Sequence, residues 1–168
     1  INVNNELITM GQRTIGYTDA VMDSGMKVNS ELIKQLKFSD VAKDVNEAVK
    51  AVILNNADAV IFTTNKLGVQ GIQAISNMKK RIPEDIAVIS FDDTSAYAVA
   101  KTSITAIKQP LEQMCKEAVR ILMESIADDE LIKNSEKVIF KSSPRSMAGR
   151  NCNAHFIGKQ GGNSANFK

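Results

Sequence analysis

Apolar residues along the chain follow two different periods, and each period predicts a different kind of element. Amphipathic helices are predicted where apolar residues recur every three or four positions: 5–24, 40–55, 67–79 and 110–127. Strands are predicted at short apolar or alternating runs: 31–37, 59–63, 86–91, 103–108 and 137–142. A short helix or irregular turn is expected over 94–101. Helices that alternate with buried strands predict an α/β fold built on a parallel sheet.

The composition is that of a globular domain with no strong bias of charge. Of the 168 residues, 43% are hydrophobic and 24% are charged, which suffices for one domain with a real core. The 21 basic and 19 acidic side chains leave a net charge of +2, without a concentrated basic cluster of the kind that binds DNA. We therefore expect a small molecule or a protein as the partner. No apolar run reaches about 18 residues, so no membrane span is predicted.

The cysteines and the two ends of the chain bear on its compartment and its boundaries. Cys115 and Cys152 lack the spacing of metal ligands and are too few for a disulfide scaffold, which favours a reducing compartment. The sequence opens on Ile1 with neither an initiator Met nor a signal-peptide pattern, so we expect an excerpt of a longer protein. Residues 151–168 are rich in Gly, Asn and Ser, and we expect a flexible tail there.

Polar residues follow three of the predicted strands. Asn65 follows the strand 59–63, Asp92 and Asp93 follow the strand 86–91, and Gln109 follows the strand 103–108. Parallel sheets bind ligands beyond the carboxyl ends of their strands, so these residues are expected along one edge. Arg13, in the first predicted helix, lies next to the apolar stripe and is a candidate to point into the same cleft.

Each of these residues also has an ordinary structural interpretation. Asn65 could form a turn or cap a helix, and Asp93 after a strand is more often an N-cap than a ligand-binding residue. Gln109 could bond to the backbone, and Arg13 could be a surface residue of its helix. Phe38 could be part of the core. Only the combination of residues favours a ligand site.

That combination suits a neutral polyol. A sugar hydroxyl both donates and accepts hydrogen bonds: Asp accepts them, Arg donates in a planar fork, and Asn and Gln do both. Phe38, at a predicted strand-to-helix junction, could stack on the apolar face of a sugar ring.

An enzyme is the less favoured alternative. Asp92 and Asp93 could hold Mg²⁺ after a strand, as in phosphoryl-transfer domains. The sequence has no P-loop and no dinucleotide-binding glycine motif. His155, the single histidine, falls in the predicted tail, which disfavours a nucleophile–histidine arrangement. We therefore predict no catalytic activity, no cofactor and no metal.

Three segments resemble the effector domain of the LacI/GalR family of transcription regulators: 58–71 (DAVIFTTNKLGVQG), 82–94 (IPEDIAVISFDDT) and 103–126 (SITAIKQPLEQMCKEAVRILMESI). The third contains the Gln-Pro pair that follows a strand in that family. Residues 13–17 (RTIGY) are similar to its Arg-x-x-Gly-aromatic helix. The resemblance covers about 1–143 in order and spacing.

The resemblance implies a ligand site and an architecture. The family's ligand-binding positions fall on these residues: Arg13, Asn65, Asp92, Gln109, Phe38 and Leu111. The implied fold is a three-layer parallel sheet with helices on both faces, a periplasmic-binding-protein-like type I lobe of an incomplete effector domain. The implied domains are a C-terminal lobe (1–108), a crossover helix of the N-terminal lobe (109–134), a return strand (135–150) and the tail (151–168).

The resemblance also implies partners. The expected effector is a small sugar or sugar derivative bound between two lobes, in a cytoplasmic repressor. DNA would be contacted only through an upstream helix-turn-helix that this sequence does not contain. A homodimer is expected, with Leu67–Asn77 and Pro110–Glu124 as candidate contacts.

One position departs from the family pattern, and one rival class shares the fold. The family usually has Asn-Asp after the strand, whereas this chain has Asn65-Lys66, which leaves open an acidic sugar or a sugar phosphate. The rival is a periplasmic sugar-binding protein of a transport system. Upstream sequence separates the two classes, since the regulator requires a helix-turn-helix and the transport protein requires a signal peptide.

Overall fold

The fold is built on a mostly parallel sheet, seen in a computed structural model that describes residues 1–3, 8–36, 41–100, 104–127, 140 and 143–146. Its strands are β1 (Asn2–Val3), β2 (Gln35–Leu36), β3 (Ala59–Phe62), β4 (Ala87–Phe91), β5 (Ile104–Lys108) and β6 (Ser143–Ser146). Strands β3, β4 and β5 are parallel neighbours, and β6 pairs antiparallel with β5.

Strands β1 and β2 form a second, two-stranded sheet beside β3. They pair in parallel with each other. The Ile1 amino group donates to the Ile61 carbonyl at 2.6 Å, and the Thr63 amide donates to the Ile1 carbonyl at 3.1 Å. These two bonds place the start of β1 beside β3, so the two-stranded sheet lies next to the four-stranded sheet β3-β4-β5-β6.

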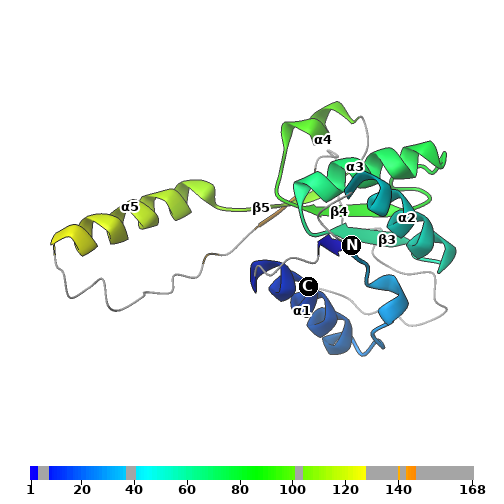
Figure 1. Ribbon diagram of the computed structural model, residues 1–168, viewed down its shortest axis with the longest axis horizontal. Helices are drawn as coiled ribbons and strands as arrows, with labels where there is room; N and C mark the ends of the chain where they lie inside the picture. The colour runs from blue at the N-terminus through cyan, green and yellow to red at the C-terminus, as the bar shows by residue number, and fades with distance from the viewer. Residues whose placement is uncertain (4–7, 37–40, 101–103, 128–139, 141–142, 147–168) are drawn as a thin grey trace.

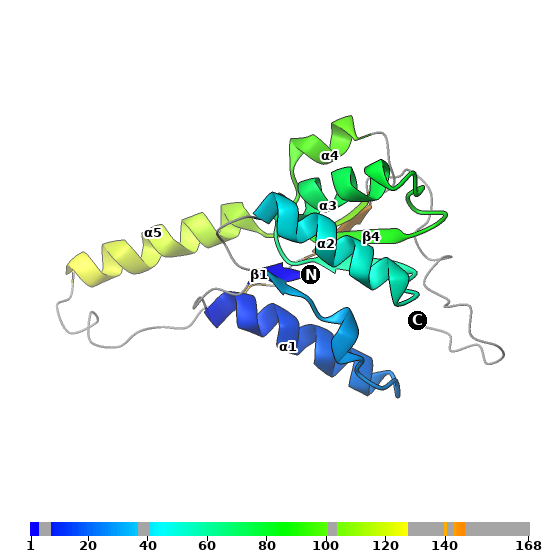
Figure 2. The same ribbon diagram turned by 45° about the vertical axis from the view of Figure 1, so that its right-hand side comes forward.

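Helices cover both faces of the sheet. They are α1 (Ile8–Asp23), α2 (Val41–Leu54), α3 (Asn65–Asn77), α4 (Ser95–Val99) and α5 (Leu111–Ala127). Helices α2 and α3 lie on one face and α1 lies on the other, whereas α5 leaves the sheet and extends away from it (Figures 1 and 2). The predicted α/β class with helices on both faces is confirmed.

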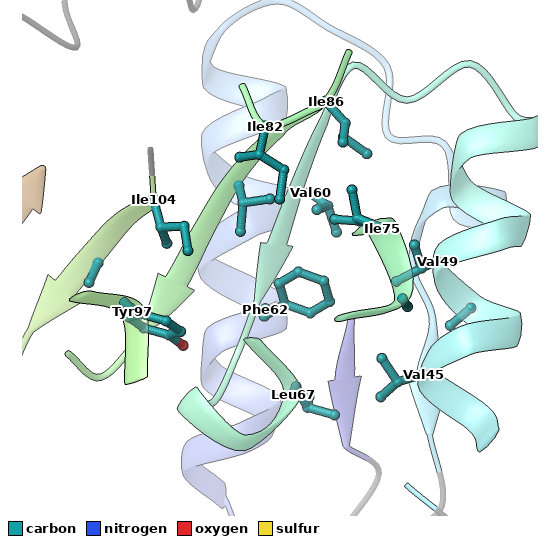
Figure 3. Packing of buried hydrophobic residues seen from close by; sticks show 14 of the residues in the cluster. Val45, Val49, Val60, Phe62, Leu67, Ile75, Ile82, Ile86, Tyr97 and Ile104 are labelled. Carbon is teal, nitrogen blue, oxygen red and sulfur yellow. The ribbon is translucent and has the colours of Figure 1, made fainter. Parts of the chain in front are cut away.

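The core lies between the sheet and the helices α2 and α3. Alternate residues of the strands face it, and Val60, Phe62, Val88 and Ile104 are at most 5% exposed. They pack with apolar residues of α2 and α3, as Figure 3 shows for Phe62 and Ile75. The other face of the sheet is only half-buried, in keeping with the single helix α1 that lies there.

The predicted strand over 31–37 is wrong in its first half. The structure has a short 3₁₀ helix over Ser30–Leu32, followed by β2 over Gln35–Leu36. The Asn29 side chain accepts a hydrogen bond from the Glu31 amide at 3.0 Å and caps the 3₁₀ turn. Local side-chain bonding of this kind competes with strand pairing, and a loose apolar alternation does not reveal it.

Other boundaries shift, and some predictions fall outside the described residues. A strand is found at Ser143–Ser146, and of the predicted strand 137–142 the structure describes only Phe140, which lies outside any strand. Helix α3 begins at Asn65, two residues before the predicted start at 67. Phe38 and the predicted tail 151–168 lie outside the described residues. Across the described ranges, no helix combines the length and apolar character needed to cross a membrane.

Gly71 is expected to be required for the packing of α3 on the sheet. A β-carbon at this position would overlap with the Phe62 ring. Gly71→Ala should lower the free energy of unfolding by about 1–3 kcal/mol, the usual cost of overpacking a core. Urea unfolding measures the change. The matched control is Gly11→Ala in α1, where nothing lies within 4 Å, so higher helix propensity should keep or raise stability. Equal effects of the two variants would contradict this account of α3 packing.

Candidate ligand-binding site

Three polar side chains from distant parts of the sequence meet beyond the carboxyl ends of β4 and β5. Gln109 donates from Nε2 to the Asp92 carboxylate. Arg13, from α1, places Nη1 4.0 Å from the other carboxylate oxygen of Asp92. The three residues therefore form a connected group of one cation, one anion and one carboxamide.

Arg13 is held by two further contacts. Its Nη1 donates to the Thr63 carbonyl, just beyond β3, and its guanidinium carbon lies 4.2 Å from the centre of the Phe91 ring. The side chain is 16% exposed. Guanidinium groups stack on aromatic faces, and this packing orients the planar fork of donors. A guanidinium has five N–H donors, so these contacts leave donors for a ligand.

Asn2 fixes the helix that carries Arg13. Its side-chain nitrogen donates to the Met10 carbonyl and to the Thr14 hydroxyl, both at 2.9 Å. Its side-chain oxygen accepts from the Thr63 hydroxyl at 2.5 Å. The buried amide thereby ties β1, the first turns of α1 and the end of β3 together, which brings Arg13 over the sheet edge.

Asp92 adopts a backbone conformation that few residues with a side chain adopt. Its φ is +65°, in the left-handed region, and its amide donates to the Ile107 carbonyl at 3.1 Å. Asp tolerates this region better than most residues, and such conformations cluster at functional sites. The side chain is 28% exposed, so a molecule from solvent can reach the carboxylate.

Asn65 lies at the same edge but outside this connected group. It is the first residue of α3, and its side chain is exposed. The helix cap is Thr64, whose hydroxyl accepts from the Leu67 amide at 3.2 Å. The interpretation of Asn65 as a helix cap is therefore wrong. The same holds for Asp93, because Thr94 caps α4 through its hydroxyl.

Leu111 is 63% exposed at the start of α5, two residues after Gln109. Sequence reasoning missed two other members of the site. Phe91 falls in a predicted buried strand, and no residue type marks the Thr63 carbonyl, because every residue has a carbonyl. The one feature of the sequence that could have indicated Phe91 as a site residue is its aromatic side chain directly before Asp92.

No metal site accompanies these side chains in the part of the chain that the structure describes, where no three His, Cys, Asp or Glu side chains gather closely enough to hold an ion. A separate pocket of about 440 Å³ lies at the opposite end of β4, lined in part by Ile72, Ser76, Lys80 and Ile82. The polar group around Asp92 is a different place, where the Asp92 side chain is open to solvent.

An open α/β lobe with a polar group beyond its strand ends defines a class of small-molecule binding domain. The sequence matches the family model of the periplasmic binding protein-like domain over residues 2–146. The chain therefore belongs to this family, in the form of the effector domain of LacI-type transcription regulators. These relatives are regulators and not enzymes, which confirms the prediction of no catalytic activity.

Two curated relatives illustrate the match. The HTH-type transcriptional regulator CelR of Thermobifida fusca is 27% identical over 127 residues, which cover 74% of this chain and 36% of CelR. The HTH-type transcriptional repressor PurR of Aliivibrio fischeri is 30% identical over 141 residues, 82% of this chain and 40% of PurR. The chain thus spans about two fifths of the length of these relatives.

Solved structures share the fold. A complex of the transcriptional regulator CelR with cellobiose superposes with a TM-score of 0.70 at 23% identity, over 88% of this chain and 44% of that chain. A LacI-family transcription repressor from Corynebacterium glutamicum gives a TM-score of 0.67 at 25% identity, over 85% of this chain and 53% of that chain.

Arg13 is expected to stabilise the fold as well as to shape the site. Arg13→Met removes the bond to the Thr63 carbonyl and the stacking on Phe91, and should lower the free energy of unfolding by about 1–3 kcal/mol. Urea unfolding measures this loss. Arg81→Met is the control, since Arg81 is exposed and pairs with Asp85 at the surface, so its loss should be smaller. A larger loss for Arg81→Met would refute the buried anchoring of Arg13.

Proposed function

We propose that this chain senses a small sugar or sugar derivative, which binds at the sheet edge formed by Arg13, Asp92 and Gln109. The convergence of these three side chains on one point is the observation that carries the proposal. Asn65, Leu111 and Phe38 are proposed as further contacts, with Phe38 stacking on the sugar ring.

The donors and acceptors of the group match a polyol. Asp92 accepts hydrogen bonds from hydroxyls, Arg13 donates to hydroxyl oxygens, and the amide of Gln109 can do both. Charge-assisted bonds of this kind contribute roughly 1.5–3 kcal/mol each once water is excluded. The cellobiose bound by the related CelR structure supports a saccharide as ligand. Lys66, directly after Asn65, also permits an acidic sugar or a sugar phosphate.

A second lobe would close over the site. We assign residues 1–108 to the C-terminal lobe, 109–134 to a crossover helix of the N-terminal lobe and 135–150 to the return strand. Helix α5 leads away from the sheet directly after Gln109, which supports the assignment (Figure 1). Val119, Leu122 and Ile126 on this helix are 59–69% exposed, as expected of a helix that packs against another part of the protein.

The proposed output is a change in DNA binding by a dimer in the cytoplasm. Helices α3 and α5 are the candidate dimer contacts, and an upstream helix-turn-helix would bind the operator. Ligand changes DNA binding only if it has different affinities for the two lobe arrangements. A hundredfold difference corresponds to about 2.7 kcal/mol, which two hydrogen bonds formed only on closure would supply.

Asp92→Asn is expected to weaken saccharide binding at least tenfold, since roughly 1.4 kcal/mol corresponds to a factor of ten. The variant keeps the shape of the side chain but loses its charge. The measurement is calorimetric titration of the complete polypeptide that carries this sequence, after a thermal-shift screen of neutral sugars and sugar phosphates, because a binder raises apparent stability. Asp19→Asn, on the exposed surface of α1, is the control with the same change of charge.

The regulator should retain operator binding in the Asp92→Asn variant and lose its response to the sugar. Unchanged affinity and unchanged response in this variant would show that the site lies elsewhere. Saturable binding with no effect on DNA binding would support a sugar-binding protein without a regulatory role.

A further inference from the structure

Two buried hydroxyl groups lie behind the candidate site. Ser90, in β4, has no exposed surface, and Tyr97, in α4, is 2% exposed. Their side-chain oxygens are 2.6 Å apart, so one hydroxyl donates to the other. Neither residue belongs to the connected group of Arg13, Asp92 and Gln109.

The hydroxyl pair bonds to the backbone at the ends of both central strands. Tyr97 donates to the Asn65 carbonyl at 3.3 Å. Each hydroxyl has one proton, so Ser90 donates to Tyr97 when Tyr97 donates to Asn65. The Thr64 and Phe91 carbonyls, at 3.4 Å and 3.1 Å, are alternative acceptors for the Ser90 proton. The pair therefore connects the start of α3, the last residues of β4 and the helix α4.

The packing of α3 leaves room for this pair. A β-carbon on Gly68 would overlap with the hydroxyl oxygens of both Tyr97 and Ser90. The helix can thus approach the strand end closely only where it has no side chain. Burial raises the pKa of Tyr97, so its hydroxyl keeps the proton that it donates.

We propose that Ser90 and Tyr97 are positioning residues that hold Asn65 and Asp92 at a fixed separation and so set the affinity for the ligand. This inference rests on the proposed function. Tyr97 bonds to the carbonyl of Asn65, one proposed ligand contact, and to Ser90, which lies two residues before Asp92, another proposed contact. This pair of side-chain bonds therefore joins the start of α3 to the end of β4.

Tyr97→Phe tests the proposal without removing the ring from the core. The Ser90 hydroxyl can then donate to the Thr64 or the Phe91 carbonyl, so the variant should fold. Its affinity for the saccharide found in the screen should fall about tenfold, as expected when a site loses a bond that fixes its geometry. Ile75→Val is the control for stability alone, because Ile75 is a fully buried residue of α3 outside the network. This control should lower the unfolding temperature and leave affinity within twofold.

Ser90→Ala and the double variant show whether the two hydroxyls act as one unit. If they do, the double variant should lose no more affinity than the single variant with the larger loss, because either change alone breaks the connection. Additive losses would overturn the role of the pair as a unit. If Tyr97→Phe loses no more affinity for the saccharide than Ile75→Val does, the two hydroxyls contribute only to stability, and the proposal is overturned.

Amide hydrogen exchange gives a readout that does not depend on the ligand. Exchange in 64–68 and 91–93 should be faster in Tyr97→Phe than in the wild type, whereas exchange in α2 should be unchanged. Unchanged protection in both segments would overturn the positioning role, even if a sugar binds. Faster exchange in a protein that binds no saccharide would refute the proposed function and leave the coupling of the strand ends intact.

Discussion

Strands β3, β4 and β5 end at one edge of the sheet because they are parallel and their last residues pair with one another. Phe62 pairs with Ser90, and Phe91 pairs with Ile107. The residues that follow each strand must therefore leave the sheet close together. A parallel strand needs a crossover before the next one begins, so the polar residues at this edge are separated in sequence by the helices that cover the sheet. The rest of the site depends on this alignment.

The alignment alone does not complete the site, because one member comes from a helix on the half-buried face. Arg13 reaches the edge because Asn2 holds α1 to the end of β3. The Thr63 carbonyl and the Phe91 ring then fix its guanidinium. Buried hydrogen-bonded groups are costly to leave unpaired, so the Asn2 network favours a single placement of α1.

The opposite face of the sheet supports the site through close packing. Gly68 and Gly71 let α3 approach the Ser90–Tyr97 pair and the Phe62 ring. The same helix begins at Asn65, at the edge where Asp92 lies. Core packing and site geometry therefore share one element, and a shift of α3 would be felt at both.

The amino-acid sequence by itself determined the order of most helices and strands, because burial on one or both faces imposes periods that are visible without any partner. It also determined that Asn65, Asp92 and Gln109 follow strands. Only the tertiary structure decided that Arg13 lies against Asp92, that Asn65 stays outside the connected group, and that Ser90 and Tyr97 bond to each other. The contact between Arg13 and Asp92 joins residues 79 positions apart (92 − 13), and Arg13 also bonds to a backbone carbonyl, that of Thr63. Local patterns record which face of an element is buried, but not which distant group it meets there.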